Sequence, residues 1–452
     1  MNPAIFREYD IRGIADTDFD TDFAYALGQA YGTYVIGQGK KRVAVGRDCR
    51  LTSEKYAAAL RQGLCATGLH VLDLGICPTP LMYFSLYHYD VDGGIQVTGS
   101  HNPPEYNGFK ICIDKVTIHG PAIQELRTVI ERKTFLSGVG REEAAPIIAP
   151  YQEFMVRQFG HLTRPIAVVV DAGNATAGPV APPIFRAMGC QVTELFCELD
   201  GRFPHHHPDP TIPTNLTHLI TAVKEAGAEI GIAYDGDADR LGLVDRHGRI
   251  IWGDEMMVLF ARDILQRHPG AVIVSEVKCS QRLFDDIAQK GGKPIMWKAG
   301  HSLLKAKMRE TGALLGGEMS GHMFFADRYY GYDDAIYASC RMLDILGRTG
   351  KEVAELLADL PVAYATPEMR VECPDEHKFR IAAQVRDYFR GRYEIIEVDG
   401  VRVKFPHGWG LVRASNTQPV LVLRFEATTQ EQLAEYRALV EDVVEQIRKE
   451  LR

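Results

Sequence analysis

The sequence predicts an α/β protein with three α/β units followed by a smaller α+β unit. Apolar, strand-like runs such as Ala271–Ser275 alternate with helix-spaced stretches as far as Pro361, which is typical of mostly parallel sheets covered by helices on both faces. Beyond Pro361 the composition changes, and a chain of 452 residues has room for about three or four domains. The expected domains are residues 1–146, 147–250, 251–361 and 362–452.

In the first two units, helices and strands are expected to alternate. Ser53 stands at the start of a helical run and is expected to act as its N-cap. The run Val-Ala-Val-Gly-Arg-Asp, which ends at Asp48, is expected to be a buried strand that leads into a turn. The expected helices are residues 23–35, 53–67, 78–87 and 151–159, and the expected strands are residues 41–48, 70–74, 93–97, 165–171 and 229–234.

The third unit continues the alternation, and the fourth has a higher share of strands. A polar, proline-bearing stretch at 137–146 is expected to separate the first two units. The expected helices are residues 254–268, 303–311, 378–389 and 430–451, and the expected strands are residues 271–275, 312–315, 364–371, 393–398, 401–405, 410–412 and 420–425.

Composition and charge exclude several classes of protein. With 46% hydrophobic and 24% charged residues, the chain has the composition of an ordinary globular protein. A net charge of −8 argues against nucleic acid or an anionic membrane as partner. Nine scattered cysteines without paired spacing indicate reduced thiols, and no stretch has the roughly 18 apolar residues of a membrane span. We therefore expect a cytoplasmic protein.

The stretch from Thr98 to Pro104 follows a predicted strand and presents one hydroxyl, that of Ser100. Its sequence is Thr-Gly-Ser-His-Asn-Pro-Pro. Gly99 allows an unusual backbone angle, and the two prolines hold the end of the loop extended. Ligands of open α/β sheets bind at the carboxyl ends of the strands, which favours a functional loop. The alternative is a surface turn built from ordinary turn residues.

A second polar loop carries three carboxylates at alternate positions, Asp235, Asp237 and Asp239. It follows the buried strand at 229–234 and contains a glycine that can bend it. Unpaired carboxylates in one small space repel each other, so a divalent cation is expected there. The small number of protein ligands fits Mg²⁺ better than Ca²⁺. The alternative is an acidic turn in solvent.

Two further loops carry groups suited to a sugar phosphate. Glu318, Ser320 and His322, flanked by glycines, can hydrogen-bond a polyol. The segment Arg413–Thr417 combines an arginine, two hydroxyls and an amide, which can form a phosphate nest. Three adjacent histidines, 205–207, rarely face one ion together, so we expect them to be structural.

Together these loops resemble the α-D-phosphohexomutase family. TGSHNPPEYNGFK resembles its phosphoserine loop, DGDADR its metal loop, GEMSGH its sugar loop and RASNTQP its phosphate loop. The four motifs occur in the family's order, one in each predicted domain, and the resemblance extends over essentially the whole chain. It implies four domains around a central cleft.

The resemblance also implies roles for individual residues. Ser100 would carry a phosphoryl group and transfer it to a hexose monophosphate, giving a 1,6-bisphosphate that returns its other phosphate to Ser100. Mg²⁺ would bind to Ser100, Asp235, Asp237 and Asp239, and glucose 1,6-bisphosphate would serve as activator. The implied catalytic residues are Ser100, His101, Lys110, Arg12, Arg240 and His322, of which Lys110 and His322 are candidate bases and Arg12, His101, Lys110 and Arg240 are expected to be cations. The implied substrate-binding residues are Tyr9, Lys278, His301, Glu318, Ser320, Arg413, Ser415, Asn416 and Thr417.

The choice of sugar depends on the loop around Met319. Glu318 and Ser320 would bind O3 and O4, which glucose and mannose present identically, and Met319 resembles the branch that acts on both sugars. The expected partners are hexose phosphates, and a monomer or weak dimer is expected. The alternatives are a phosphoglucosamine mutase of the same family, a phosphoserine-dependent sugar phosphatase and a non-catalytic sugar-phosphate binding protein.

Overall fold

The computed structural model describes residues 2–416 and 418–450, which form two compact units. Unit 1 contains the chain up to Asp263 together with Ser320–Leu357, and unit 2 contains Ile264–Met319 and the chain from Ala358 onward. The chain therefore passes between the units three times. None of the described helices combines the length and apolar character needed to cross a membrane.

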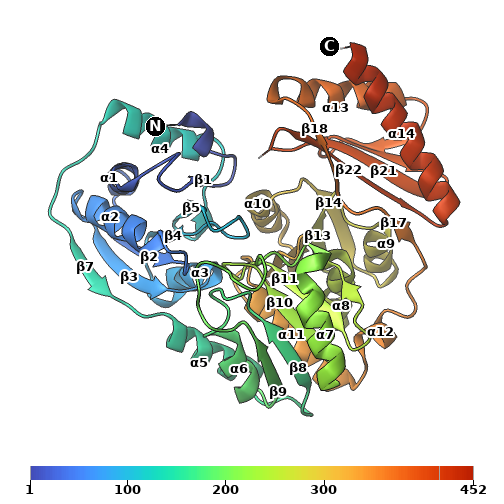
Figure 1. Ribbon diagram of the computed structural model, residues 1–452, viewed down its shortest axis with the longest axis horizontal. Helices are drawn as coiled ribbons and strands as arrows, with labels where there is room; N and C mark the ends of the chain where they lie inside the picture. The colour runs from blue at the N-terminus through green and yellow to red at the C-terminus, as the bar shows by residue number, and fades with distance from the viewer. Residues whose placement is uncertain (1, 417, 451–452) are drawn as a thin grey trace. The chain divides into compact units, whose positions relative to one another are not determined.

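The first sheet of unit 1 is mixed. Its strand order is β1-β5-β4-β2-β3-β7, with β6 paired to β5 (Figure 1). β2, β3, β4 and β7 run parallel, whereas β5 is antiparallel to both β4 and β1. The strands are β1 (Ile11–Ile14), β2 (Arg42–Arg47), β3 (His70–Ile76), β4 (Gly93–Val97), β5 (Tyr106–Ile113), β6 (Val116–Thr117) and β7 (Arg141–Ala144).

Helices cover both faces of this sheet. The core on one face is formed by α1, α2 and α4 with apolar side chains of β2, β4 and β5. On the other face α3 lies against the strands, with Met82 next to Gly94. The helices are α1 (Thr21–Ile36), α2 (Ser53–Cys65), α3 (Thr79–His88) and α4 (Pro121–Arg132).

The second sheet of unit 1 has the order β12-β11-β10-β8-β9. β10 reads Ile-Gly-Ile-Ala-Tyr and is buried along its whole length. It pairs in parallel with β8 and antiparallel with β11. The loop between β10 and β11 therefore begins at the end of a buried strand. The strands are β8 (Ala167–Asp171), β9 (Gln191–Leu195), β10 (Ile230–Tyr234), β11 (Leu241–Asp245) and β12 (Ile250–Ile251). The helices include α5 (Ile148–Phe159), α6 (Ala181–Ala187), α7 (Thr217–Ala226), α8 (Gly253–Arg267), which continues into unit 2, and α11 (Ala335–Thr349).

Unit 2 combines a parallel sheet with an antiparallel sheet. β13 pairs in parallel with β14 and β15, and α9 and α10 connect these strands. The antiparallel sheet has the order β17-β22-β21-β20-β19, with β18 paired to β22, and α13 and α14 pack on it. The elements are β13 (Val272–Glu276), α9 (Gln281–Gln289), β14 (Lys293–Trp297), α10 (His301–Thr311), β15 (Leu315–Gly317), β17 (Tyr364–Ala365), β18 (Met369–Glu372), α13 (Asp375–Phe389), β19 (Glu394–Ile396), β20 (Val401–Phe405), β21 (Gly408–Ala414), β22 (Val420–Ala427) and α14 (Gln430–Glu450). The predicted class, α/β units followed by a smaller α+β unit, is confirmed.

Two local predictions were wrong, and one strand was missed. Ser53 is not an N-cap: the cap position of α2 is Thr52, and the Ser53 hydroxyl donates to the Asp48 carboxylate. Gly99 does not take a left-handed backbone angle; Ser100, with φ = 50°, does. The missed strand is the edge strand β7, whose four residues are all exposed and which lies within the stretch expected to separate the first two units.

Candidate active site

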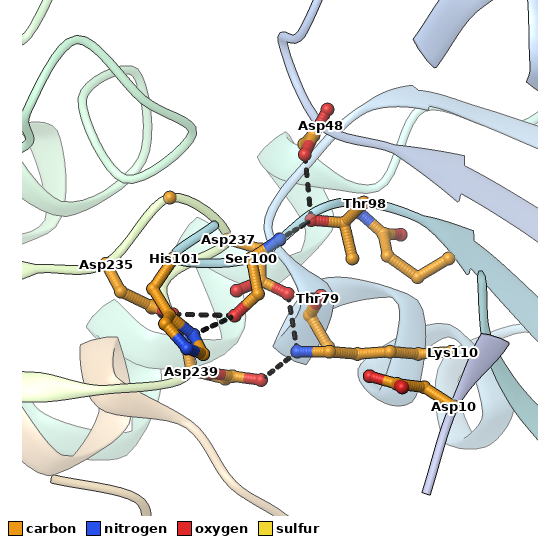
Figure 2. A network of polar contacts seen from close by, with 12 residues as sticks. Asp10, Asp48, Thr79, Thr98, Ser100, His101, Lys110, Asp235, Asp237 and Asp239 are labelled. Carbon is orange, nitrogen blue, oxygen red and sulfur yellow. Dashed lines mark hydrogen bonds and ion pairs between the residues drawn. The ribbon is translucent and has the colours of Figure 1, made fainter. Parts of the chain in front are cut away.

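Ser100 lies in the turn between β4 and β5, with its side chain directed at the acidic loop after β10 (Figure 2). It is buried, and its Oγ donates to Asp235 Oδ2 over 3.0 Å. The same Oγ lies 3.2 Å from Nδ1 of His101. The two loops approach closely because residue 236 is glycine: a Cβ there would stand 2.4 Å from the Ser100 carbonyl oxygen.

The three carboxylates of the acidic loop converge in the interior of unit 1. Asp235, Asp237 and Asp239 are each 0% exposed, and one ligand atom from each lies within 4.8 Å of the others. The turn is held together by Asp235 Oδ1, which accepts from the backbone N–H groups of Asp239 (3.0 Å) and Arg240 (3.1 Å).

Lys110 and Thr79 complete the surroundings of the acidic loop. Lys110 Nζ, from β5, donates to Asp237 Oδ2 over 2.6 Å and also to Asp239 Oδ2. Burial alone would lower the pKa of Lys110, but the carboxylates of Asp237, Asp239 and Asp235 raise it well above its ordinary range. Lys110 is therefore a fixed positive charge. The Thr79 hydroxyl donates to Asp237 Oδ2, and its backbone N–H donates to Asp237 O over 2.9 Å.

The donor set fits a divalent cation. Lys110 is one charge against three carboxylates, and burial together with Asp239 and Asp237 raises the pKa of Asp235 well above its ordinary value. Asp237 Oδ1 and Asp239 Oδ1 are buried and have no hydrogen-bond partner among the described residues. Hard oxygen donors of this kind are the ligands that Mg²⁺ prefers. The residues present therefore suit the metal that the sequence predicts.

His322 faces the same cluster and is held between cationic and anionic groups. Its Nε2 accepts from Arg240 Nε over 3.1 Å, so its ring proton belongs on Nδ1. Nδ1 lies 3.3 Å from Asp333 Oδ2 and 3.5 Å from Asp239 Oδ1. A neutral ring with Nε2 as acceptor is the form that can take a proton.

Arg12 and His101 border the serine loop in different charge states. Arg12, in β1, donates to Asn102 Oδ1 over 3.1 Å and also to Asp10. Burial, followed by the nearby cations Arg240 and Arg12, holds the pKa of His101 well below its ordinary value. This lowered pKa favours a neutral His101 in the unphosphorylated chain, in contrast to the expected cation.

Unit 2 gathers the predicted sugar-binding residues around the carboxyl end of β13. Lys278 Nζ pairs with Glu368 Oε2 at 2.9 Å and with Glu276 Oε2 at 3.4 Å. Glu276, fully buried at the end of β13, accepts the backbone N–H of Met319 over 2.9 Å. Glu318 Oε1 accepts the N–H of Gly300, just before His301 at the start of α10, over 2.8 Å.

The phosphate loop of unit 2 is connected to the same segment through Asp399. Its Oδ2 accepts from Arg413 Nε over 2.8 Å and from the N–H of Ala299 over 3.1 Å. Ser415 Oγ accepts the N–H of Gln418 over 3.1 Å, which closes the turn after β21. Asn416 is exposed in this turn, and Thr417 lies outside the described residues.

Each unit thus brings its own predicted residues together, and each adds residues that the sequence did not reveal. Tyr9 precedes β1 and Ser320 follows the sugar-loop residue Met319. The additional residues are Thr79, Glu276, Asp333 and Asp399. The histidines 205–207 are absent from the two metal-ligand groups found among the described residues, and His206 Nε2 lies 3.0 Å from Asp171 instead.

Four family models match the chain in sequence order. They describe phosphoglucomutase/phosphomannomutase α/β/α domains I, II and III at residues 3–137, 149–248 and 252–364, and the C-terminal domain at residues 368–443.

Known proteins resemble the chain over almost its full length. A phosphomannomutase/phosphoglucomutase of Pseudomonas aeruginosa is 47% identical over 431 residues, covering 95% of this chain and 93% of the relative. A phosphoglucomutase of Neisseria gonorrhoeae is 45% identical over 433 residues, with coverages of 94% and 93%. The crystal structure of a phosphoglucomutase/phosphomannomutase family protein from Burkholderia thailandensis superposes with a TM-score of 0.93 at 45% identity and covers 98% of both chains.

Fold, site and relatives agree on an isomerase that acts as an intramolecular phosphotransferase. The chain belongs to the phosphoglucomutase/phosphomannomutase family, the α-D-phosphohexomutases. Its reaction is the reversible transfer of phosphate between C1 and C6 of mannose or glucose phosphate.

Proposed function

We propose that the phosphate moves by way of Ser100. Phosphorylated Ser100 gives its phosphoryl group to the free hydroxyl of a hexose monophosphate, and the resulting 1,6-bisphosphate returns its other phosphate to Ser100. The observation that carries this proposal is the buried Ser100 Oγ, 3.0 Å from Asp235 at the edge of the acidic cluster. Glucose 1,6-bisphosphate would activate the unphosphorylated chain by the same transfer.

The charge around Ser100 suits phosphoryl transfer, which depends on positioning and on neutralising the phosphoryl oxygens. We propose that Ser100, Asp235, Asp237 and Asp239 hold Mg²⁺, which when bound supplies a Lewis acid to the phosphoryl group. Lys110, held by the carboxylates, keeps its charge throughout.

Two further groups of the cluster supply proton transfer and orientation. His322, oriented by Arg240 and Asp333 on its two ring nitrogens, accepts the proton of the attacking sugar hydroxyl and returns it in the opposite half-reaction. Lys110 is the other candidate, but its raised pKa keeps it protonated, so it cannot accept that proton. Arg12, Arg240 and His101 hold the phosphoryl oxygens by hydrogen bonds.

Substrate binding falls to two groups of residues. The sugar and its neighbouring phosphate are bound by Tyr9, Lys278, His301, Glu318 and Ser320. The phosphate that does not react is held by Arg413, Ser415, Asn416 and Thr417. Holding the distant phosphate orients the reacting hydroxyl and so accelerates transfer.

A coupled assay tests the role of Ser100. The wild-type chain is expected to convert glucose 1-phosphate in the presence of Mg²⁺ and a trace of glucose 1,6-bisphosphate, and EDTA should stop the reaction. Ser100→Ala should lower kcat by at least about a thousandfold, because the phosphoryl carrier is lost. Intact mass should show one added phosphoryl group on the wild type after incubation with the bisphosphate and none on Ser100→Ala.

Two outcomes would favour other functions. Release of free phosphate in place of the isomeric sugar phosphate would indicate a phosphatase. Undiminished turnover by Ser100→Ala would exclude Ser100 as carrier. We also propose domain boundaries at 146, 250 and 361 and a cytoplasmic location. The chain is proposed to be a monomer or weak dimer, which size-exclusion chromatography with light scattering tests.

A further inference from the structure

A buried ion pair beneath the serine loop has no place in the catalytic set described so far. Asp48 and Arg50 follow β2 and are 2% and 3% exposed. They are joined by Arg50 Nε donating to Asp48 Oδ2 over 3.1 Å and by the Arg50 N–H donating to Asp48 Oδ1 over 2.9 Å. A buried charge pair is costly to desolvate, so its other contacts are of interest.

The Arg50 guanidinium binds the serine loop through four backbone carbonyl groups. Nη2 donates to Ser100 O over 2.8 Å and to Asn102 O over 2.6 Å. Nη1 donates to Tyr106 O over 3.0 Å and also to Pro103 O. Four of the five N–H donors of one planar group therefore fix both sides of the turn that presents Ser100, and the fifth binds Asp48.

Asp48 holds the start of the same turn. Its Oδ2 accepts from Thr98 Oγ1 over 2.8 Å and from the N–H of Gly99 over 3.2 Å (Figure 2). Because the Thr98 hydroxyl gives its proton to Asp48, its oxygen is available to accept the N–H of Ser100, at 2.8 Å. A chain of hydrogen bonds thus runs from Asp48 to the backbone of the proposed phosphoryl carrier.

These contacts stabilise a backbone conformation that is otherwise unfavourable. Ser100 has φ = 50°, in the left-handed region that a side chain with a Cβ rarely occupies. Strain of this kind persists only where surrounding structure enforces it. Glycine at position 99 lets the Arg50 guanidinium lie against the loop, because a Cβ there would lie 2.6 Å from Arg50 Cζ.

We propose that Arg50, oriented by Asp48, is a positioning residue that holds Ser100 in its left-handed conformation for phosphoryl transfer. The inference rests on the proposed role of Ser100 and adds the device that fixes its Oγ. Lysine cannot replace Arg50, because a single ammonium group cannot reach four carbonyl oxygens spread over the turn.

The test compares Arg50→Lys with Arg341→Lys. Arg341 is a fully buried arginine of α11 that donates to Asp327 O over 3.1 Å and to Asp263 over 3.0 Å, so its replacement controls for the loss of a buried arginine in the same unit. Arg50→Lys is expected to lower kcat about a hundredfold with KM within about twofold, because a small misplacement of the nucleophile slows transfer without removing substrate contacts. It should also slow phosphorylation of Ser100 by glucose 1,6-bisphosphate, followed by intact mass. Arg341→Lys should lower the unfolding temperature and leave both rates unchanged.

A second pair of variants keeps the inference testable if Arg50→Lys does not fold. Thr98→Val removes the hydroxyl that connects Asp48 to the Ser100 N–H and keeps the shape of the side chain, so it should lower kcat. Thr98→Ser keeps the hydroxyl and should have the wild-type kcat. Wild-type kcat in both Arg50→Lys and Thr98→Val, with Ser100→Ala inactive, would overturn the positioning role alone. An active Ser100→Ala would instead overturn the proposed function on which it rests.

Discussion

Ser100 was predicted from the sequence as the centre of the site, but the groups that hold it were not. The hydroxyl, the three aspartates and Lys110 occur in short motifs, so the chemistry of their types and spacing was visible in the chain. Thr79 and Asp333 act on those residues from positions far away in sequence. The packing of α3 beside the acidic loop reveals Thr79, and the contact of His322 Nδ1 with Asp333 Oδ2 reveals Asp333. Contacts of this kind leave no local pattern.

Thr79 provides a prediction at the scale of one hydroxyl group. It donates to Asp237 Oδ2, the oxygen that also accepts from Lys110, and so helps to orient the carboxylate. Thr79→Val should weaken Mg²⁺ binding by about tenfold to a hundredfold, as is typical when a group behind a metal ligand is removed. The Mg²⁺ concentration at half-maximal activity measures this, and titration calorimetry with Mg²⁺ provides a reading independent of turnover.

Thr79→Ser is the matched control, because it keeps the hydroxyl and should keep the wild-type Mg²⁺ requirement. An unchanged requirement in Thr79→Val would show that the backbone bond from residue 79 to Asp237 O is enough to orient the loop.

Among the elements, some with an apolar pattern were predicted and others, including the buried strand β11 and the helix α11, were not. The buried strands β2 and β10 and the helix α14 lie where alternation and helical spacing indicate them. The edge strand β7, Arg-Glu-Glu-Ala, was missed because all its residues are exposed and it has no apolar pattern; it is defined by its parallel pairing to β3. Such a strand is defined by its neighbour and not by its own residues.

The start of α11 provides a prediction about pH. Asp334 is its N-cap and accepts from the N–H of Tyr337 over 2.8 Å, and also from the hydroxyls of Tyr151 and Tyr329. Burial raises the pKa of Asp334 to about 6 in spite of these bonds. Because the folded chain then binds this proton more tightly than the unfolded chain, ionisation of Asp334 lowers stability as pH rises from about 4 to about 6.

Asp334→Asn removes that ionisation. The unfolding free energy of the variant relative to wild type should rise by up to about 3 kcal/mol between pH 4 and pH 7. Urea unfolding of both chains across this range measures the difference. A constant difference across the range would mean that the Asp334 pKa is not raised in the folded chain.

At the scale of the whole molecule, the predicted site residues are shared between the two units. Unit 1 carries Ser100 and the acidic loop, whereas unit 2 carries Glu318 and the phosphate loop. The chain leaves unit 2 and enters unit 1 between Met319 and Ser320, within the sugar loop itself. The sequence predicted one motif in each of four domains, and the four family models match in that order, but the division of the sugar loop between the two units was not predicted.

The whole chain is expected to use both sugars with similar efficiency. The relatives include a phosphomannomutase/phosphoglucomutase and a phosphoglucomutase at nearly equal identity. The ratio of kcat/KM for mannose 1-phosphate to kcat/KM for glucose 1-phosphate therefore distinguishes the two kinds of enzyme. Contacts to O3 and O4 do not distinguish sugars that differ at C2, so kcat/KM for mannose 1-phosphate and glucose 1-phosphate should agree within about tenfold. Glucosamine 1-phosphate should be turned over much more slowly.

Glu318→Gln is the informative variant, because weakening a contact common to both sugars should lower both kcat/KM values by a similar factor. Loss of activity on one sugar alone would show that Glu318 takes part in choosing between them. Comparable turnover of glucosamine 1-phosphate by the wild type would contradict the expected sugar preference.

The arginine beneath the serine loop also bears on how this enzyme can change over time. Arg50 and Asp48 bind the main chain of the turn and the hydroxyl of Thr98, but no side chain between residues 102 and 106. Pro104 and Glu105 are exposed there. The nucleophile is thus anchored through the main chain, so the side chain of Glu105 can vary during evolution without breaking the bonds that hold Ser100 in place.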